Sequence, residues 1–279
     1  MIPFTDFGGA GPLLHFAHAN AYPPGAYRPF LTALTAHYQV RAMHQRPLWS
    51  GQDAQQLTDW HLFGADLIDF FDQYEMRQVV GVGHSLGAVA MLYAAVVRPE
   101  LFRALVLVEP VFLPPHILAL AQANPGAADE MPLVKAARRR RHRWPDRQAA
   151  FDRYRTKAVF ARMSDAALWT FVQAGVQEAA DGAYVLAFPR EWEAAIYAHP
   201  PADVWELVGQ VTQPTLAIRA AESDTILPAP WRLWQEKQPA ATFMEIADSS
   251  HLLPLEKPYE LARQVLGWLG QLESGEKPL

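Results

Sequence analysis

The chain has 279 residues, of which 51% are hydrophobic and 19% are charged. This composition is typical of a globular protein with a large core, either as one domain or as a core with an insertion, and it excludes a disordered chain. The net charge of −5 argues against nucleic acid as a main partner, and the absence of cysteine excludes disulfides, thiolate metal sites and cysteine nucleophiles.

The two ends of the chain show alternating strand and helix patterns. Apolar runs predict strands at 13–19, 38–43, 78–82, 104–108, 214–219 and 242–246. Helical spacing of apolar residues predicts helices at 28–38, at 60–74 with Thr58 as N-cap, between residue 85 and Pro99, and near 258–272. Strands that alternate with helices predict an α/β fold, with a doubly wound, mostly parallel sheet covered by helices on both faces.

Residues 111–202 break this alternation. They contain no convincing series of strands, are rich in aromatic residues and are typical of several helices. We expect a helical cap over the carboxyl edge of the sheet, where ligands of such sheets bind, with residues 1–110 and 203–279 as the core. The basic segment 135–147 is interpreted as a solvated helix face, with an anion-steering patch at a pocket mouth as the alternative.

The segment Gly83-His84-Ser85-Leu86-Gly87 fits the pattern Gly-x-Ser-x-Gly. In this pattern a serine stands on a sharp turn between a strand and a helix, and glycines let the backbones on either side approach closely. The predicted strand before Ser85 and the predicted helix after it supply that context. Ser85 is therefore the candidate nucleophile.

A serine hydroxyl needs an adjacent base, which an acid must orient. His251 is the candidate base, because it lies in the loop between the last predicted strand and the last predicted helix. Among the acids, Asp224 is the first choice because it leaves room for a turn after the strand at 214–219, and Glu222 is the second. Glu109, at the end of the strand after the serine's helix, is the third.

The attack of a serine on a carbonyl creates an oxyanion, which needs fixed hydrogen-bond donors. One predicted donor is the backbone N–H of Leu86 at the start of the helix. The second comes from the loop 18–24 after the first predicted strand, where Asn20 is the candidate. His18 is interpreted as a structural residue that ties this loop together.

The motif at 83–87, the loop His18-Ala19-Asn20, Asp224 and His251 together resemble the α/β-hydrolase superfamily over nearly the whole chain. Two positions depart from the family pattern. Ala19 replaces the glycine of a His-Gly-x loop, and Ser250 replaces the glycine that often precedes the histidine. The serine nucleophile disfavours dehalogenase and epoxide-hydrolase chemistry, which by resemblance would use an aspartate there.

This resemblance implies a serine hydrolase, with a carboxylesterase acting on small to medium acyl esters as the first expectation. Hydrolases of carbon–carbon bonds, thioesters or lactones use the same triad and are the alternatives, and a non-catalytic ligand-binding member is less favoured. We expect no cofactor, because the chain lacks a complete Gly-x-Gly-x-x-Gly dinucleotide fingerprint, and no metal, because it lacks a metal-binding motif.

The start of the chain bears on its location. The first eleven residues contain Asp6 and lack both a basic segment and a long apolar stretch, so we expect no signal peptide. The longest apolar runs are too short to cross a membrane. These patterns favour a cytoplasmic protein. We expect its partner to be a small-molecule substrate rather than a nucleic acid or a membrane, with a homodimer as one possible assembly.

Overall fold

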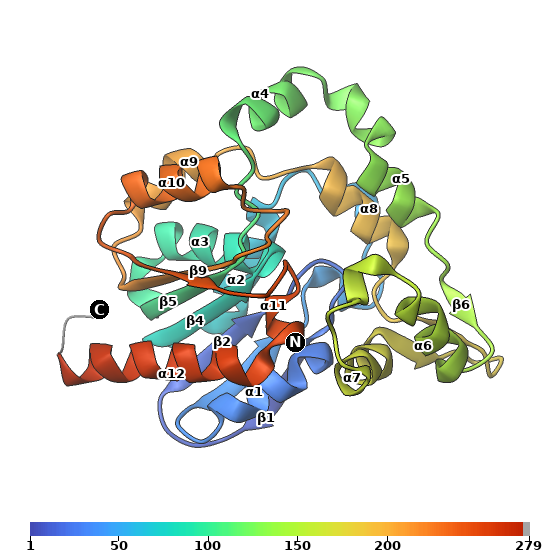
Figure 1. Ribbon diagram of the computed structural model, residues 1–279, viewed down its shortest axis with the longest axis horizontal. Coiled ribbons are helices and arrows are strands. Elements are labelled where there is room, and N and C mark those ends of the chain that lie inside the picture. The colour runs from blue at the N-terminus through green and yellow to red at the C-terminus, as the bar shows by residue number, and fades with distance from the viewer. Residues whose placement is uncertain (276–279) are drawn as a thin grey trace.

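The computed structural model describes residues 1–275 and is built on a seven-stranded sheet with the order β1-β3-β2-β4-β5-β9-β10 (Figure 1). The neighbouring strands run parallel except β1 and β3, which are antiparallel. The strands are β1 (Phe4–Gly8), β2 (Leu13–Ala17), β3 (Gln39–Met43), β4 (Val79–His84), β5 (Phe102–Val108), β9 (Thr215–Ala220) and β10 (Thr242–Ile246).

Helices cover both faces of this sheet, as the alternating pattern predicts. The core on one face includes apolar side chains of α1 (Arg28–Leu34) and α12 (Pro258–Ser274). The core on the other face includes those of α2 (His61–Gln73), α3 (Leu86–Val97) and α10 (Pro228–Lys237). The strands β4 and β9 are buried at every residue, which agrees with their largely apolar sequences.

The structure differs from the predicted core elements at two places. The strand β1 was not predicted. It pairs only with β3, at the edge of the sheet, and its residues Thr5 and Asp6 are polar, so it shows no apolar run. The N-cap of α2 is Trp60, not Thr58, and the carboxylate of Asp59 accepts a 2.8 Å hydrogen bond from the His61 N–H. No helix within residues 1–275 has the length and apolar character needed to cross a membrane.

Residues 111–202, which we propose to form the cap, connect β5 to α9 (Val204–Leu207) and the rest of the core. Their helices are α4 (Pro115–Ala123), α5 (Pro132–Arg138), α6 (Arg147–Arg155), α7 (Asp165–Gly175) and α8 (Arg190–Ala198). The expectation that this region lacks a series of strands was wrong. A small antiparallel sheet of order β6-β8-β7 joins Arg143–Trp144, Tyr184–Leu186 and Val176–Glu178, each too short to show an alternating pattern.

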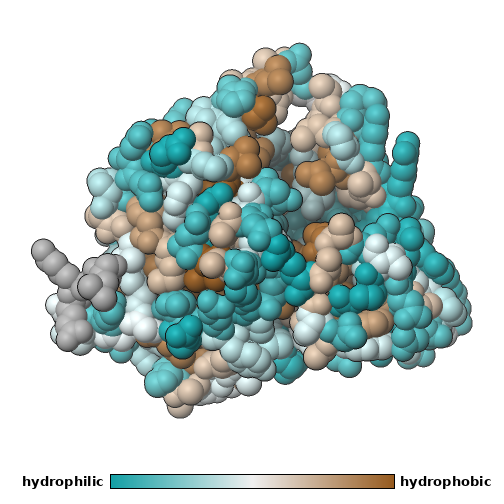
Figure 2. Space-filling model, in the orientation of Figure 1, coloured by the Kyte–Doolittle hydropathy of each residue, from teal (hydrophilic) through white to brown (hydrophobic). Residues whose placement is uncertain are grey.

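The surface is hollowed between α4 and α8 (Figure 2). A cavity of about 580 Å³ there is bordered by His61, Tyr93 and Asp203. The His61 ring stacks on the Tyr93 ring with a centroid distance of 3.9 Å, and both side chains contact the Asp203 carboxylate. A second cavity, of about 420 Å³, lies among α5, α6, α8 and the loop after β2.

Candidate active site

Ser85 lies on the turn between β4 and α3. Its backbone has φ 56° and ψ −118°, a conformation that is strained for a residue with a side chain. The turn is tight enough to require glycine on both sides. A Cβ at Gly83 would lie 2.5 Å from the carbonyl oxygen of Gly87, and one at Gly87 would collide with the backbone of Ala17.

The imidazole of His251 lies between Ser85 and a carboxylate. Its Nδ1 is 3.1 Å from Oε2 of Glu109, and its Nε2 is 3.0 Å from Oγ of Ser85. An ionised carboxylate only accepts hydrogen bonds, so Nδ1 carries the proton and Nε2 is left as the acceptor for the serine hydroxyl. His251 therefore has the tautomer that a base toward Ser85 requires.

Glu109 occupies its position because β5 lies next to β4. His84 and Val108 are partners across these strands, so the next residues, Ser85 and Glu109, leave the sheet side by side. The side chain of Glu109 is fully buried. Its carboxylate accepts hydrogen bonds from the Ala220 N–H and the Ser223 hydroxyl, both at 2.6 Å. These donors compensate the burial of a negative charge.

The prediction that Asp224 receives the Nδ1 hydrogen is wrong. Asp224 is exposed, four residues beyond the end of β9, and its carboxylate accepts a 3.3 Å hydrogen bond from the Thr225 hydroxyl. Glu222, the second choice, is also exposed and forms an ion pair with Arg162 of the proposed cap.

The two predicted oxyanion donors come from the turn that carries Ser85 and from the loop after β2. Leu86 is the first residue of α3, and its backbone N–H forms no hydrogen bond within the described part of the chain. The side-chain amide of Asn20 donates to the carbonyl of Glu193 in α8 at 3.2 Å, which turns it toward that helix. The backbone N–H of Asn20 is also without a partner in residues 1–275 and is free to donate.

His18 ties the loop after β2 to the core. Its Nδ1–H donates to the Ala19 carbonyl at 2.9 Å, and its Nε2 accepts from the Gln45 N–H at 3.1 Å. Complete burial lowers the pKa of His18 to about 3, so its ring is neutral. Ala19, which stands where the family pattern has glycine, is buried, and the left-handed backbone occurs two residues later, at Ala21 with φ 66°.

His84 is a site residue that the sequence reasoning missed. Its Nε2–H donates to the His251 carbonyl and its Nδ1 accepts from the Tyr27 hydroxyl, both at 2.8 Å. The same hydroxyl accepts a 3.2 Å hydrogen bond from the Ala19 N–H. This chain joins the loop after β2, the nucleophile turn and the loop that carries His251. The available signal in the sequence was the position of His84 directly before the serine.

Ser223 and Ser250 also hold the site and were not assigned these contacts. The Ser223 hydroxyl donates to Glu109 and accepts from the Ile226 N–H at 2.9 Å. The Ser250 N–H donates to the carboxylate of Glu256 at 2.8 Å, and its hydroxyl contacts the same group. The serine that replaces a glycine before His251 thus anchors that loop. Residues 1–275 contain no cluster of three or more His, Asp or Glu residues arranged to hold a metal ion.

Comparison with known proteins places the chain in a family. A profile described as Alpha/beta hydrolase family matches residues 15–264. The chain belongs to this family. Its relatives include the Abhydrolase domain-containing protein ACTT2 of Alternaria alternata, which is 24% identical over 233 residues, covering 71% of this chain and 85% of that protein.

Solved structures show that the α/β-hydrolase fold is shared almost from end to end. An E-2-(acetamidomethylene)succinate hydrolase has a TM-score of 0.81 at 17% identity, covering 96% of this chain and 95% of that one. The thioesterase domain from the curacin biosynthetic pathway has a TM-score of 0.77 at 17% identity, covering 94% of each chain. The fold and the family membership agree with the resemblance seen in the sequence.

Proposed function

We propose that this α/β hydrolase is a serine hydrolase in which Ser85 is the nucleophile, His251 the base and Glu109 the orienting acid. One observation carries the proposal: the His251 ring lies 3.0 Å from the Ser85 hydroxyl and 3.1 Å from the Glu109 carboxylate, through its two different nitrogens. Such an arrangement activates the serine hydroxyl and stabilises the imidazolium that forms when the ring takes its proton.

The proposed reaction proceeds through an acyl-enzyme. Ser85 Oγ attacks the carbonyl carbon while Nε2 of His251 takes the hydroxyl proton, and the same nitrogen then gives that proton to the leaving alcohol. Water, deprotonated by His251, releases the acid and restores the serine. The N–H groups of Leu86 and Asn20 are the proposed donors to the oxyanion, and both are without another partner in residues 1–275.

A carboxylic ester is the proposed bond, and a small or medium acyl ester the proposed substrate class. The mechanism needs no cofactor, because the serine, the base and the oxyanion donors all belong to the chain. The similar structures include a hydrolase of a succinate derivative and a thioesterase domain, so a thioester is the main alternative among the bonds this triad can cleave. A pure ligand-binding role is less supported, because it gives no reason for the alignment of Ser85, His251 and Glu109.

A panel of 4-nitrophenyl esters of rising acyl length, run beside thioesters and a lactone, tests this proposal. We expect ester hydrolysis with one optimal chain length, and its loss in Ser85→Ala. Hydrolysis that persists in purified Ser85→Ala would place the reaction elsewhere. If thioesters are cleaved with a much higher kcat/KM than esters of the same acyl group, the proposed substrate class becomes the thioester.

A further inference from the structure

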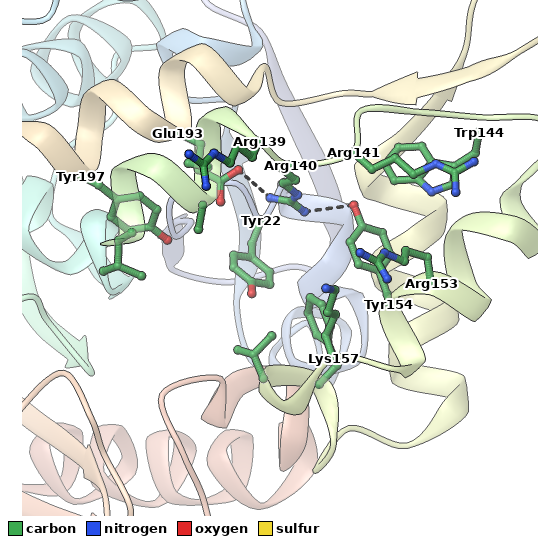
Figure 3. Close-up of a pocket in the computed structure, with 15 residues that line it drawn as sticks. Tyr22, Arg139, Arg140, Arg141, Trp144, Arg153, Tyr154, Lys157, Glu193 and Tyr197 are labelled. Atoms are coloured by element: carbon green, nitrogen blue, oxygen red, sulfur yellow. Dashed lines mark hydrogen bonds and ion pairs between the residues drawn. The ribbon is translucent and has the colours of Figure 1, made fainter. Parts of the chain in front are cut away.

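The cavity of about 420 Å³ among α5, α6, α8 and the loop after β2 combines apolar walls with an excess of positive charge (Figure 3). Leu133, Trp144, Val159 and Phe160 supply apolar surface. Five cationic side chains also line it, and Glu193 is the acid among the described lining residues. The cations are Arg139, Arg140, Arg141, Arg153 and Lys157.

Arg140 and Glu193 are held together in the lining of this cavity. The Arg140 guanidinium donates to the Glu193 carboxylate at 2.7 Å and to the Tyr154 hydroxyl at 3.0 Å, and Figure 3 shows it between the two. Both side chains of the ion pair are largely buried, with 19% and 11% exposed. The acid of the cavity is therefore already neutralised, and the remaining cations determine its charge.

Arg139, Arg153 and Lys157 are exposed at the mouth of the cavity. Within residues 1–275, none of the three forms an ion pair with a carboxylate, whereas Arg138 and Arg143 in the same basic region pair with Asp129 and Asp181. Long cationic side chains without a carboxylate partner, grouped around one opening, create a positive potential that attracts anions.

Two phenol groups add hydrogen-bond donors to this cavity. The hydroxyls of Tyr22 and Tyr197 form no hydrogen bond within the described residues, and in Figure 3 the Tyr197 hydroxyl points toward the ring of Tyr22. Burial raises the pKa of both phenols well above the usual value. They therefore stay protonated near neutral pH and can donate to an anion.

The loop after β2 contributes Tyr22 to this cavity and Asn20 to the proposed oxyanion site. Tyr22 lies two residues after Asn20, and the Asn20 side chain donates to the carbonyl of Glu193. Ser85 is not among the lining residues, so a ligand in this cavity would reach the serine only through an extended chain. That requirement predicts a dependence on chain length.

We propose that this cavity is a substrate subsite for an acyl chain that ends in an anionic group. The inference rests on the proposed function. The apolar walls hold the chain, the hydroxyls of Tyr22 and Tyr197 donate to the anion, and Arg139, Arg153 and Lys157 attract it. A carboxylate and a phosphate monoester share this chemistry, and the test distinguishes them.

The test measures kcat/KM for two series of substrates: 4-nitrophenyl monoesters of dicarboxylic acids, and the same esters capped by methyl at the free acid. We expect a ratio of free to capped above one, which peaks at one chain length and falls as NaCl is added. The variant Arg153→Gln/Lys157→Gln should lower the ratio about three- to tenfold, and Tyr22→Phe should lower it about tenfold. The control Arg138→Gln, in the same basic region but outside the cavity, should leave it unchanged.

Inhibition of the neutral ester reaction separates the two anions. Heptanoate binding more tightly than heptyl phosphate assigns the subsite to carboxylates, and the reverse assigns it to phosphates. If neither anion inhibits better than heptanol, and the ratio stays at or below one at every chain length in a protein that hydrolyses neutral esters, the subsite is disproved while the proposed function stands.

If no ester is cleaved at all, the proposed function fails, and calorimetry decides the subsite alone. The probe is monomethyl adipate bound to Ser85→Ala. Binding that weakens about tenfold in Ser85→Ala/Tyr22→Phe supports the subsite. Equal binding by the two variants, or no binding, overturns it.

Discussion

At the residue scale, the choice of carboxylate depends on where each strand ends. Glu109 directly follows β5, the neighbour of the strand that carries Ser85, and its φ of 49° turns the chain at that point. Asp224 lies further from its own strand and reaches solvent. The structure thus gives the imidazole a buried acid that is held by two other donors.

Substitution of Glu109 and of Asp224 should show which of the two carboxylates supports catalysis. Glu109→Gln keeps the shape of the side chain but removes the charge that fixes the His251 tautomer, so we expect kcat to fall by about 10³–10⁴. Asp224→Asn should keep kcat within about threefold, because its carboxylate does not contact the imidazole. Steady-state hydrolysis of a 4-nitrophenyl ester measures both, with circular dichroism as the check of folding. An inactive Asp224→Asn beside an active Glu109→Gln would reverse the assignment.

The Tyr27 hydroxyl is predicted to position the site through His84. Tyr27→Phe removes the donor to His84 and leaves the buried Ala19 N–H without an acceptor. We expect kcat to fall about 10- to 100-fold through misplacement of the neighbouring loops, with a loss of about 1–3 kcal/mol in unfolding free energy. Tyr74→Phe, which removes a hydrogen bond to Ile2 far from the site, is the matched control. An unchanged kcat in Tyr27→Phe would show that this hydrogen-bond chain does not position the site.

The sequence identified Ser85 and His251 as candidates, because local pattern determines their surroundings. A strand, a tight glycine turn and a helix identify the position of Ser85, and a loop before the last helix identifies that of His251. The acid that contacts His251 could not be chosen in this way, since the loops after β5 and after β9 both begin at the same edge of the sheet and both carry carboxylates. The order of the strands and the burial of Glu109, which are tertiary properties, decide between them.

At the scale of elements, the approach of α3 to β2 depends on Gly87. A methyl group there would collide with backbone atoms of Ala17, which cannot move independently of the sheet. We expect Gly87→Ala to lower the unfolding free energy by about 3 kcal/mol or more. Urea unfolding followed by tryptophan fluorescence measures the change.

Gly270→Ala is the control for this prediction. Gly270 lies in α12 with no atom within 4 Å of its added Cβ, so alanine should raise the stability by about 0.5–1 kcal/mol through helix propensity. Equal effects of the two substitutions would contradict the account of the tight turn.

Element type was predictable where the periodic pattern is long, and not where packing decides. The strand at 242–246 was predicted with its observed bounds, and the last helix with its start at Pro258. The three short strands of the proposed cap were missed, because two or three residues carry no period. The pairing of β6 with β8 also joins residues about 40 positions apart in the chain, such as Trp144 and Tyr184. Their conformation follows from tertiary contacts rather than from local propensity.

At the scale of the whole molecule, buried neutral histidines should limit stability in acid. Burial lowers the pKa of His15 and of His18 to about 3, and that of His84 well below its usual value. Between pH 6.5 and 3 the unfolded chain therefore binds protons that the folded chain does not. The free energy of unfolding should fall as the pH falls through this range, by up to about 1.4 kcal/mol per pH unit for each histidine.

His15→Leu tests this dependence. Both ring nitrogens of His15 are buried without a hydrogen-bond partner, and the ring packs between Phe70 and Phe71, so leucine removes the titrating group without breaking a hydrogen bond. Urea unfolding at several pH values should show a shallower slope below pH 6.5 for this variant, and the exposed His37→Leu should leave the slope as it is. Identical slopes in wild type and His15→Leu would show that this ring does not contribute.

The proposed function requires that His251 and Glu109 activate Ser85, and covalent labelling measures that activation directly. The wild-type protein is incubated with a fluorophosphonate, and peptide mass spectrometry locates the adduct. We predict one adduct, on Ser85, whose rate of formation falls by about 10³ or more in Glu109→Gln and is unaffected in Asp224→Asn. Labelling at another residue, or no labelling of the folded wild-type protein, would contradict it.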